Sequence, residues 1–310
     1  MNHDKTALNG LIYIAFGYEY LLMAAYSAFT AKKYNPDISC TIVTNLKISN
    51  KAILNKYFDN VFEEDLKNEF NRYVKTNIIE YALFSKGAYL DCDTEVLDNL
   101  DPILTCLERY DVILKINPRP PSKDYHIAAG IHGTDFPMWN GGVIFFRNNV
   151  SAKKLFSDWK KYFLEMGKRS DQPALARAIY ENPGIKLLSV NYIWNTFPTD
   201  LVLIKKGRQK NQSRIWHYRN PQDFPEVAKK IYQHHPVISA SIKIEDDIVK
   251  EEIKKTEQKY CILSSAYYQS RWLRPFYLKY LKMLYKIGIK TKPVLTRSRQ
   301  RTGAKFKKME

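Results

Sequence analysis

The first 45 residues carry a strand–helix–strand pattern that limits the fold more than any other part of the chain. Residues 11–17 form an apolar run that ends at a glycine, as in a buried strand. A helical pattern follows from Glu19 to about Lys33, and residues 41–45 indicate a second strand. Parallel strands need such a crossover. The opening therefore predicts an α/β fold with parallel strands.

Later segments extend this pattern. Residues 138–148 predict a glycine-containing loop that leads into a strand. Ser151 is expected to cap the helix that follows, and Ser170 or Asp171 to cap the next one. Residues 186–190 predict a late strand. Helices and strands thus continue to alternate through the first two thirds of the chain.

Two aspartates one residue apart follow an apolar run. Asp91 and Asp93 are separated by Cys92, and in an extended segment side chains at i and i+2 share a face. Two carboxylates aimed at one point suit Mg²⁺ or Mn²⁺. The alternative is a solvated turn, because acid-x-acid at a strand end is common. The pair predicts a divalent metal site where the fold brings further ligands beside the two carboxylates.

The carboxyl ends of the predicted strands should lie at one edge of the sheet. Ligands of open α/β sheets bind at the carboxyl ends of strands. Residues 16–18, 44–45 and 91–93 should therefore lie together. Gly17 would let a nucleotide approach the backbone, and Tyr18 could stack on a base. A simple turn glycine is the alternative for Gly17.

The order of these motifs resembles GT-A fold glycosyltransferases, closest to the family 8-like nucleotide-diphospho-sugar transferases with a DxD motif. The resemblance covers about residues 8–220. It rests on Phe-Gly-Tyr at 16–18, Lys75, Tyr-Leu-Asp-Cys-Asp-Thr at 89–94, Asn-Gly-Gly-Val at 140–143, Asp-Gln-Pro-Ala-Leu at 171–175 and Tyr-Ile-Trp-Asn at 192–195. It implies a GT-A, Rossmann-like catalytic domain with a mixed, mostly parallel sheet flanked by helices.

The resemblance also implies the roles of individual residues. Asp91, Asp93 and His217 would bind Mn²⁺ or Mg²⁺, and Lys75, Asp171 and Gln172 would act in catalysis. The donor nucleotide and sugar would contact Ala15, Phe16, Gly17, Tyr18, Thr44, Asn45, Asp91, Cys92, Asn140, Gly141 and Arg219. Relatives often follow the histidine with a glycine and a Lys-Pro pair that hold the diphosphate. This chain has Tyr-Arg-Asn-Pro at 218–221, so Arg219 would take the phosphate role.

The activity implied is metal-dependent transfer of a sugar from a nucleotide-diphosphate sugar, expected to be a UDP-sugar, to a glycan or lipid-linked acceptor. The resemblance favours retention, with Asp171 as base or acceptor-orienting residue. One alternative is a nucleotidyltransferase, which would usually carry a glycine-rich basic loop after the first strand. Residues 17–20 lack that loop. The other alternative is a non-catalytic basic protein that binds membranes or nucleic acid.

The positive charge of the chain is concentrated near its C-terminus. We assign residues 1–260 to the catalytic domain and 261–310 to a basic, aromatic-rich helical extension whose end is expected to be disordered. Residues 271–310 hold 13 Lys or Arg and one acidic residue, a net charge of +12. Such a segment suits an anionic membrane surface. A helix packed on the domain with a solvated tail is the alternative, and no motif supports nucleic-acid binding.

The remaining features concern location. The first residues lack the pattern of a signal peptide, and no run of about 18 apolar residues could span a membrane. The four cysteines are widely spaced, which indicates a reducing compartment. We expect a cytoplasmic enzyme, peripheral on the inner face of a membrane, that builds a cell-surface glycan or lipopolysaccharide.

Overall fold

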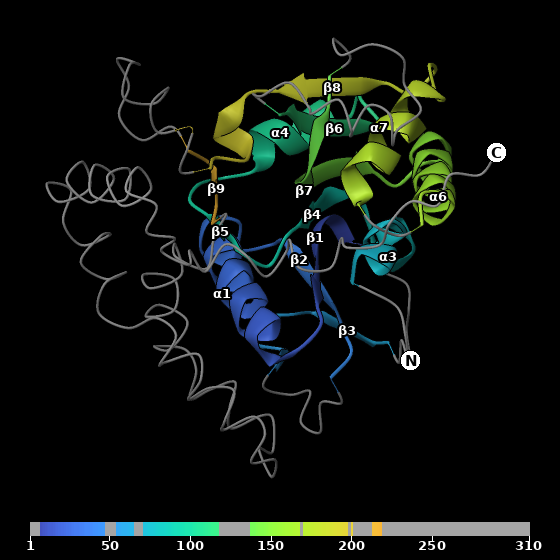
Figure 1. The fold of residues 1–310 in the computed structure, drawn as a ribbon. Coiled ribbons are helices and arrows are strands. Elements are labelled where there is room, and N and C mark those ends of the chain that lie inside the picture. Colours follow the sequence, from blue (N-terminus) through green and yellow to red (C-terminus); the bar gives the residue numbers. More distant parts are fainter. Residues whose placement is uncertain are drawn as a thin grey trace, which may run out of the picture. The chain divides into compact units, whose positions relative to one another are not determined.

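The computed structural model describes residues 7–46, 54–64, 71–117, 137–167, 170–197, 200 and 213–218 (Figure 1). All of them belong to one compact unit, residues 1–253. The strands are β1 (Ala7–Ala15), β2 (Ser39–Thr44), β3 (Asn60–Glu63), β4 (Phe84–Leu90), β5 (Thr94–Val96), β6 (Val112–Ile116), β7 (Trp139–Arg147), β8 (Leu187–Val190) and β9 (Ile215–His217). The helices are α1 (Tyr18–Tyr34), α3 (Asn71–Lys75), α4 (Asp101–Cys106), α6 (Val150–Glu165) and α7 (Asp171–Tyr180), with 3₁₀ turns η1 (Ile78–Tyr81) and η2 (Tyr192–Trp194).

Seven strands form one sheet in the order β3-β2-β1-β4-β7-β6-β8. Strands β3, β2, β1 and β4 are parallel, and β7 runs antiparallel to both of its neighbours, β4 and β6. Strand β8 pairs in parallel with β6. This is the mixed, mostly parallel sheet that the sequence predicts. The carboxyl end of β4 consequently lies beside the amino end of β7.

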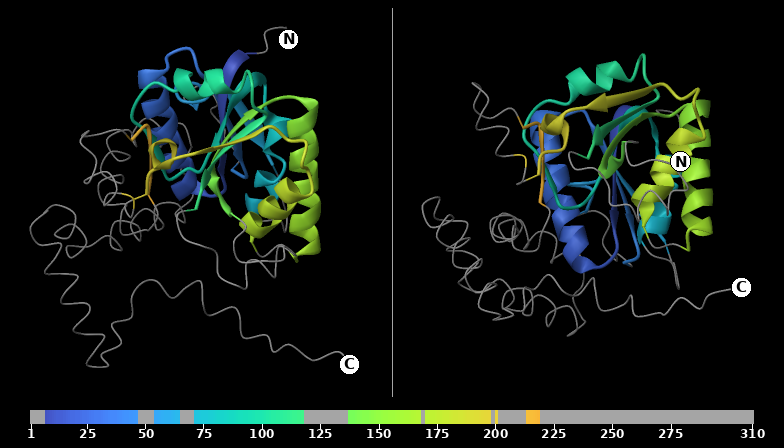
Figure 2. Two further views of the ribbon diagram at one scale, coloured as in Figure 1. Left: turned by 90° about the horizontal axis from the view of Figure 1, so that it is seen from above. Right: turned by 45° about the horizontal axis from the view of Figure 1, so that its top comes forward.

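Helices cover both faces of this sheet. Leu11 and Tyr13 of β1 pack in one apolar cluster with residues of α1 and α4. Ile12 and Ile14 point to the other face and pack in a second cluster with α6 and α7. Figure 2 shows α1 on one side of the sheet and α6 and α7 on the other. Burial on both faces explains why residues 11–15 of β1 are all apolar rather than every second one.

The predicted elements at the N-terminus are confirmed, and two local predictions are wrong. Residues 140–142 lie within β7 rather than in a loop, because Lys115 pairs with Asn140 and Ile116 with Trp139. Helix α6 is capped by Asn149, whose Oδ1 accepts from the Ala152 amide at 2.9 Å, and not by Ser151. Asparagine and serine are comparable N-caps, so sequence alone does not separate neighbouring candidates.

A small second sheet pairs β5 with β9, and Thr94 lies opposite His217. This pairing joins the end of the described chain to the turn after β4. None of the helices in the described ranges is long and apolar enough to cross a membrane. The predicted extension, residues 261–310, lies outside the described residues, so the domain boundary stays a prediction.

Candidate active site

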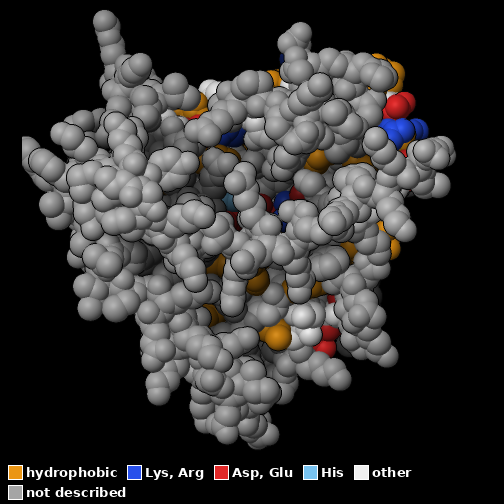
Figure 3. Space-filling view, in the orientation of Figure 1, with side chains coloured by type: hydrophobic (Ala, Val, Ile, Leu, Met, Phe, Trp, Pro, Cys, Tyr) orange, Lys and Arg blue, Asp and Glu red, His pale blue; other side chains and the backbone are white. Residues whose placement is uncertain are grey.

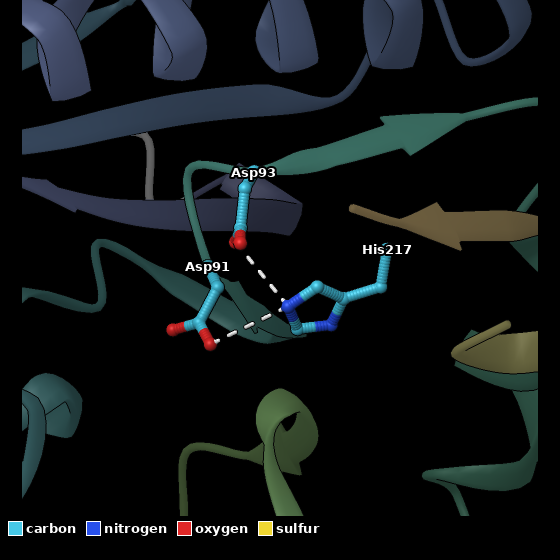
Figure 4. Close-up of side chains that lie close together, drawn as sticks. All are labelled: Asp91, Asp93 and His217. Atoms are coloured by element: carbon cyan, nitrogen blue, oxygen red, sulfur yellow. Dashed lines mark ion pairs between the residues drawn. The ribbon is translucent and has the colours of Figure 1, made fainter. Parts of the chain in front are cut away.

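Three side chains of types that can bind a metal ion converge beyond the carboxyl end of β4. Asp91 and Asp93 lie on the turn between β4 and β5, and His217 ends β9 (Figure 4). His217 Nε2 lies 3.2 Å from Asp93 Oδ1 and 3.8 Å from Asp91 Oδ2. The three ligand atoms all lie within 4.8 Å of one another. Figure 3 shows acidic, basic and histidine side chains together near the centre of this face.

Hydrogen bonds fix the turn that carries the aspartates. Thr94 Oγ1 donates to the Asp91 carbonyl at 2.8 Å, and the Tyr218 amide donates to the Asp93 carbonyl at 2.8 Å. The Cys92 thiol donates to the Ile14 carbonyl at 3.1 Å. Burial raises the pKa of the Cys92 thiol well above its usual value, so the thiol stays protonated and keeps donating. The middle of the motif is therefore tied to the end of β1.

The other oxygen of Asp91 is held by two donors. Lys75 Nζ lies 2.9 Å from Asp91 Oδ1, and the Tyr89 hydroxyl donates to the same oxygen at 2.6 Å. Burial, followed by the nearby Asp91 charge, raises the pKa of Tyr89 well above its usual value, so this hydroxyl remains a donor. Asp91 is thus oriented through Oδ1 and directs Oδ2 toward His217.

Lys75 also joins the aspartates to α7. Its Nζ lies 3.4 Å from Asp171 Oδ2, and the lysine is buried. Burial alone lowers the pKa of Lys75, but the charges and hydrogen bonds of Asp91 and Asp171 outweigh it, and the pKa lies above its ordinary value. Lys75 is therefore a fixed cation between two carboxylates. This agrees with its predicted place in the site, although the structure gives it carboxylate partners.

Gly142 provides the space that the cluster needs. A Cβ there would overlap His217 Cε1 and lie 2.7 Å from Asp91 Oδ2. The Gly142 carbonyl also accepts from the Asp91 amide at 2.8 Å. A Cβ at neighbouring Gly141 would meet nothing closer than 3.7 Å, where Asp171 Oδ2 lies. Gly142 is thus the glycine that the geometry requires.

Amide side chains line the remaining side of the site. Asn140 Oδ1 accepts from the Gly142 amide at 2.8 Å and from Asn195 Nδ2 at 2.9 Å. Asn117 Nδ2 donates to Gln172 Oε1 at 3.3 Å, and Asn140 Nδ2 lies 3.5 Å from Asn117 Oδ1. These contacts connect Gln172 of α7 with the residues beside His217.

Several of the residues predicted to bind the nucleotide lie together at the ends of β1 and β2. Asn45 Oδ1 accepts from the Gly17 amide at 2.9 Å, and Gly17 has a φ of 92°, which favours glycine. Ala15 and Thr44 pair in register at the ends of β1 and β2 and are fully buried, while Phe16 is half-buried. The nucleotide roles of these residues and of Asn140 and Gly141 stay predictions. The Tyr18 side chain and Arg219 lie outside the described part of the chain.

Sequence reasoning missed several residues of the site. Tyr89 lies two positions before Asp91, so a shared face in β4 could have indicated it. Lys115 interrupts the apolar run of β6, which is a signal for a buried charge. Asn117 carries no signal of its own, because it reaches Gln172 only through the fold.

The donor set suits a divalent cation. Two carboxylate oxygens and one imidazole nitrogen are ligands that Mn²⁺ accepts. Gly142 leaves no side chain in the way, and the second oxygen of Asp91 is already oriented by Lys75 and Tyr89. Fixed outer partners of this kind are typical of metal ligands. The residues present therefore fit the ion expected from the sequence.

Comparisons with known proteins agree with this fold. Residues 88–220 match the model of the nucleotide-diphospho-sugar transferase family. Comparison with curated protein sequences gives no match. The structure is similar to that of the galactosyltransferase LgtC in complex with donor and acceptor sugar analogs, at 16% identity and a TM-score of 0.52, covering 75% of this chain and 96% of that chain.

Two further solved structures share the fold. One is an active-site variant of LgtC with a glutamine replaced by glutamate, at 15% identity and a TM-score of 0.54, covering 74% of this chain and 95% of that chain. The other is the bifunctional glycosyltransferase WbbM, at 13% identity and a TM-score of 0.54, covering 74% of this chain and 50% of that chain. The chain therefore has the fold of these glycosyltransferases, and its residues 88–220 match the nucleotide-diphospho-sugar transferase family.

Proposed function

We propose that this protein is a glycosyltransferase that moves a sugar from a UDP-sugar to a glycan or lipid-linked acceptor, with a divalent cation and with retention at the anomeric carbon. The observation that carries the proposal is the convergence of Asp91, Asp93 and His217 next to the Lys75–Asp171 pair. A cation-binding cluster beside a buried carboxylate is what departure of a diphosphate from a sugar requires. The family match of residues 88–220 favours this reading over the nucleotidyltransferase alternative.

The cation would be held by Asp91 Oδ2, Asp93 and His217 Nε2. When bound, it offsets the negative charge that grows on the departing diphosphate. Imidazole nitrogen is a poorer ligand for Mg²⁺ than carboxylate oxygen, so the presence of His217 favours Mn²⁺ over Mg²⁺. Lys75 keeps Asp91 in place, and it stays charged because the neighbouring carboxylates raise its pKa.

Asp171 would face the transferred sugar. Its carboxylate lies at the start of α7, where the Trp159 indole donates to its backbone carbonyl at 2.8 Å. The ion pair with Lys75, at 3.4 Å, fixes the position of the carboxylate. From this position Asp171 would orient the acceptor hydroxyl or stabilise positive charge developing on the sugar ring. Retention fits because the departing phosphate can itself take the acceptor proton.

Gln172 would assist from the next position of α7. The LgtC variant described as an active-site mutant has a glutamine replaced, so a glutamine takes part in that enzyme's active site. Gln172 is the residue of this chain that supports a similar proposal, because its Oε1 is already linked to Asn117 at 3.3 Å. Its amide nitrogen would donate to a sugar hydroxyl.

A panel of sugar nucleotides tests the proposal. With Mn²⁺ present, we expect one UDP-sugar to be hydrolysed slowly and UDP to raise the melting temperature, because a ligand stabilises the state it binds. Both effects should vanish in excess EDTA. The anomeric proton of the product, followed by NMR, reports retention or inversion. Binding and hydrolysis of no sugar nucleotide in the panel would reject the proposal.

Asp171→Asn is the variant for this experiment, with Glu181→Gln at the exposed end of α7 as the control. Because Asp171 would act on the reacting sugar, kcat should fall by about 100-fold or more while UDP affinity changes little. Glu181→Gln should match the wild type in both. A proportional loss of UDP binding and rate in Asp171→Asn would mean that the residue is structural.

The basic segment would bring the enzyme to its acceptor. We propose that residues 271–310 bind anionic membrane and that the acceptor is a membrane-bound sugar, such as a lipid-linked or lipopolysaccharide-core sugar, on the cytoplasmic side. The support is the net charge of +12 interleaved with aromatic residues. Each cation near such a surface contributes roughly 1 kcal/mol, within about one Debye length.

Deletion of the residues after Trp272 should preserve donor hydrolysis and abolish co-sedimentation with anionic vesicles at low salt. The full chain should sediment with these vesicles, and less so as salt increases. Neutral vesicles provide the control. Equal sedimentation of both chains on anionic vesicles, or none by the full chain, would exclude the membrane role.

A further inference from the structure

A buried ion pair lies behind the metal-ligating histidine. Lys115 Nζ lies 2.6 Å from Asp200 Oδ2, and both side chains are 3% exposed. The same Nζ donates to the backbone carbonyl of Asn195 at 2.8 Å. Asp200 Oδ2 also accepts from the Phe197 amide at 2.9 Å. The pair therefore fixes the backbone on both sides of Thr196.

The segment held by this pair contacts the His217 ring from two directions. Phe197 stacks on the imidazole with centroids 4.4 Å apart and an interplanar angle of 29°. Asn195 Oδ1 lies 2.9 Å from His217 Nδ1. The Asn195 side chain is fully buried, so this contact is not open to replacement by bulk water.

The hydrogen-bond donors determine which ring nitrogen carries the proton. The Gly142 amide can only donate, so the Asn140 atom that faces it is Oδ1. That oxygen needs a donor from Asn195, which must be Nδ2. The Asn195 atom facing His217 is then an oxygen, which can only accept.

Both ring nitrogens of His217 face oxygens, because Nε2 also lies 3.2 Å from Asp93 Oδ1. The closer contact, 2.9 Å between Nδ1 and Asn195 Oδ1, favours one arrangement for a neutral ring. Nδ1 carries the proton and donates to Asn195, and Nε2 presents its lone pair toward Asp91 and Asp93. A chain of hydrogen bonds that starts at the Gly142 backbone thus selects the form of the ring that can bind a cation.

We propose that Asn195, with its backbone held by the Lys115–Asp200 pair, is a positioning residue that presents the unprotonated Nε2 of His217 to the metal site. The cation itself rests on the proposed function, but the placement of the ring proton does not. The two parts are therefore measured separately.

The first measurement is the tautomer, read from long-range ¹⁵N–¹H NMR spectra of histidine-labelled protein without metal, at alkaline pH where an imidazole is neutral. The chain has six histidines, and a His217→Asn spectrum identifies the signal. We expect the Nδ1–H form in the wild type and in Asn195→Asp, which keeps an acceptor. Asn195→Ala should lose the preference. An Nε2–H ring in the wild type would overturn the proposal.

The second measurement is Mn²⁺ affinity by calorimetry. Loss of an outer partner of a metal ligand typically weakens binding by 10–100-fold, and we expect this for Asn195→Ala. Asn182→Ala removes another buried asparagine, at the end of α7 remote from Asp171, and should bind as the wild type does. Lys115→Met should show the same loss as Asn195→Ala where it folds. If Lys115→Met does not fold, the affinity of Asn195→Ala alone tests the positioning role.

The outcomes separate the two proposals. Failure of the wild type to bind Mn²⁺ would reject the metal of the proposed function and leave the tautomer measurement as the test of Asn195. Wild-type Mn²⁺ affinity in Asn195→Ala would reject the positioning role and leave the proposed function intact.

Discussion

Replacement of Asp93 by asparagine is expected to lower sugar transfer by at least about 10³-fold, equivalent to about 4 kcal/mol of transition-state stabilisation. The carboxylate lies 3.2 Å from His217 Nε2 and would be a direct ligand of the cation. An amide has the same shape without the charge, so the ion would bind weakly and the departing diphosphate would lose its partner. The fold should persist, because the Asp93 side chain is partly exposed.

The measurement is kcat/KM for transfer, with circular dichroism to confirm the fold. Asp37→Asn is the matched control, because this residue is exposed in the turn before β2. It should retain the wild-type rate. Full activity of Asp93→Asn in excess EDTA would reject the metal hypothesis altogether.

Replacement of Gly142 by alanine is expected to be nearly as severe, although it adds a single methyl group. The new Cβ would overlap His217 Cε1 and crowd Asp91 Oδ2 at 2.7 Å. The overlap must displace two of the three side chains in the Asp91–Asp93–His217 cluster, and an error of about 1 Å in a site can cost about 100-fold in rate. Overpacking should also lower the free energy of unfolding by about 1–3 kcal/mol.

Gly141→Ala separates this effect from a general cost of alanine in β7. Its Cβ would meet only ordinary contacts at 3.7 Å and beyond. It should therefore keep the wild-type Mn²⁺ affinity and free energy of unfolding, measured by calorimetry and by urea denaturation. Equal Mn²⁺ affinity in the two variants would show that Gly142 is not a steric requirement of the site.

The parts of the fold that sequence predicts well are those set by local patterns. Strand β1 and helix α1 follow from an apolar run and a helical repeat that need no distant partner. The start of β7 was misjudged because its first residues are held by pairing with β6. Glycines in that segment suggest a loop when the partner strand is unknown.

The site likewise contains residues that local sequence patterns identify and residues that only the fold brings together. Asp91 and Asp93 stand out because they are close in sequence and follow an apolar run. His217 was placed beside them by family resemblance alone, since its position depends on the β5–β9 pairing. The partners of Lys75 could not be predicted, because Asp171 reaches it from a helix that lies on the other side of β7 in the sequence.

The β5–β9 pairing also has a consequence for the order in which the chain folds. The last strand of the seven-stranded sheet is β8, which ends at Val190, whereas Tyr218 bonds Glu95 at a sequence separation of 123 residues. Closing so long a loop costs entropy that local contacts do not recover. We expect residues 213–218 to dock late, onto a sheet that is already complete. During synthesis, a chain that has not yet reached His217 would carry the aspartates without the means to retain a metal.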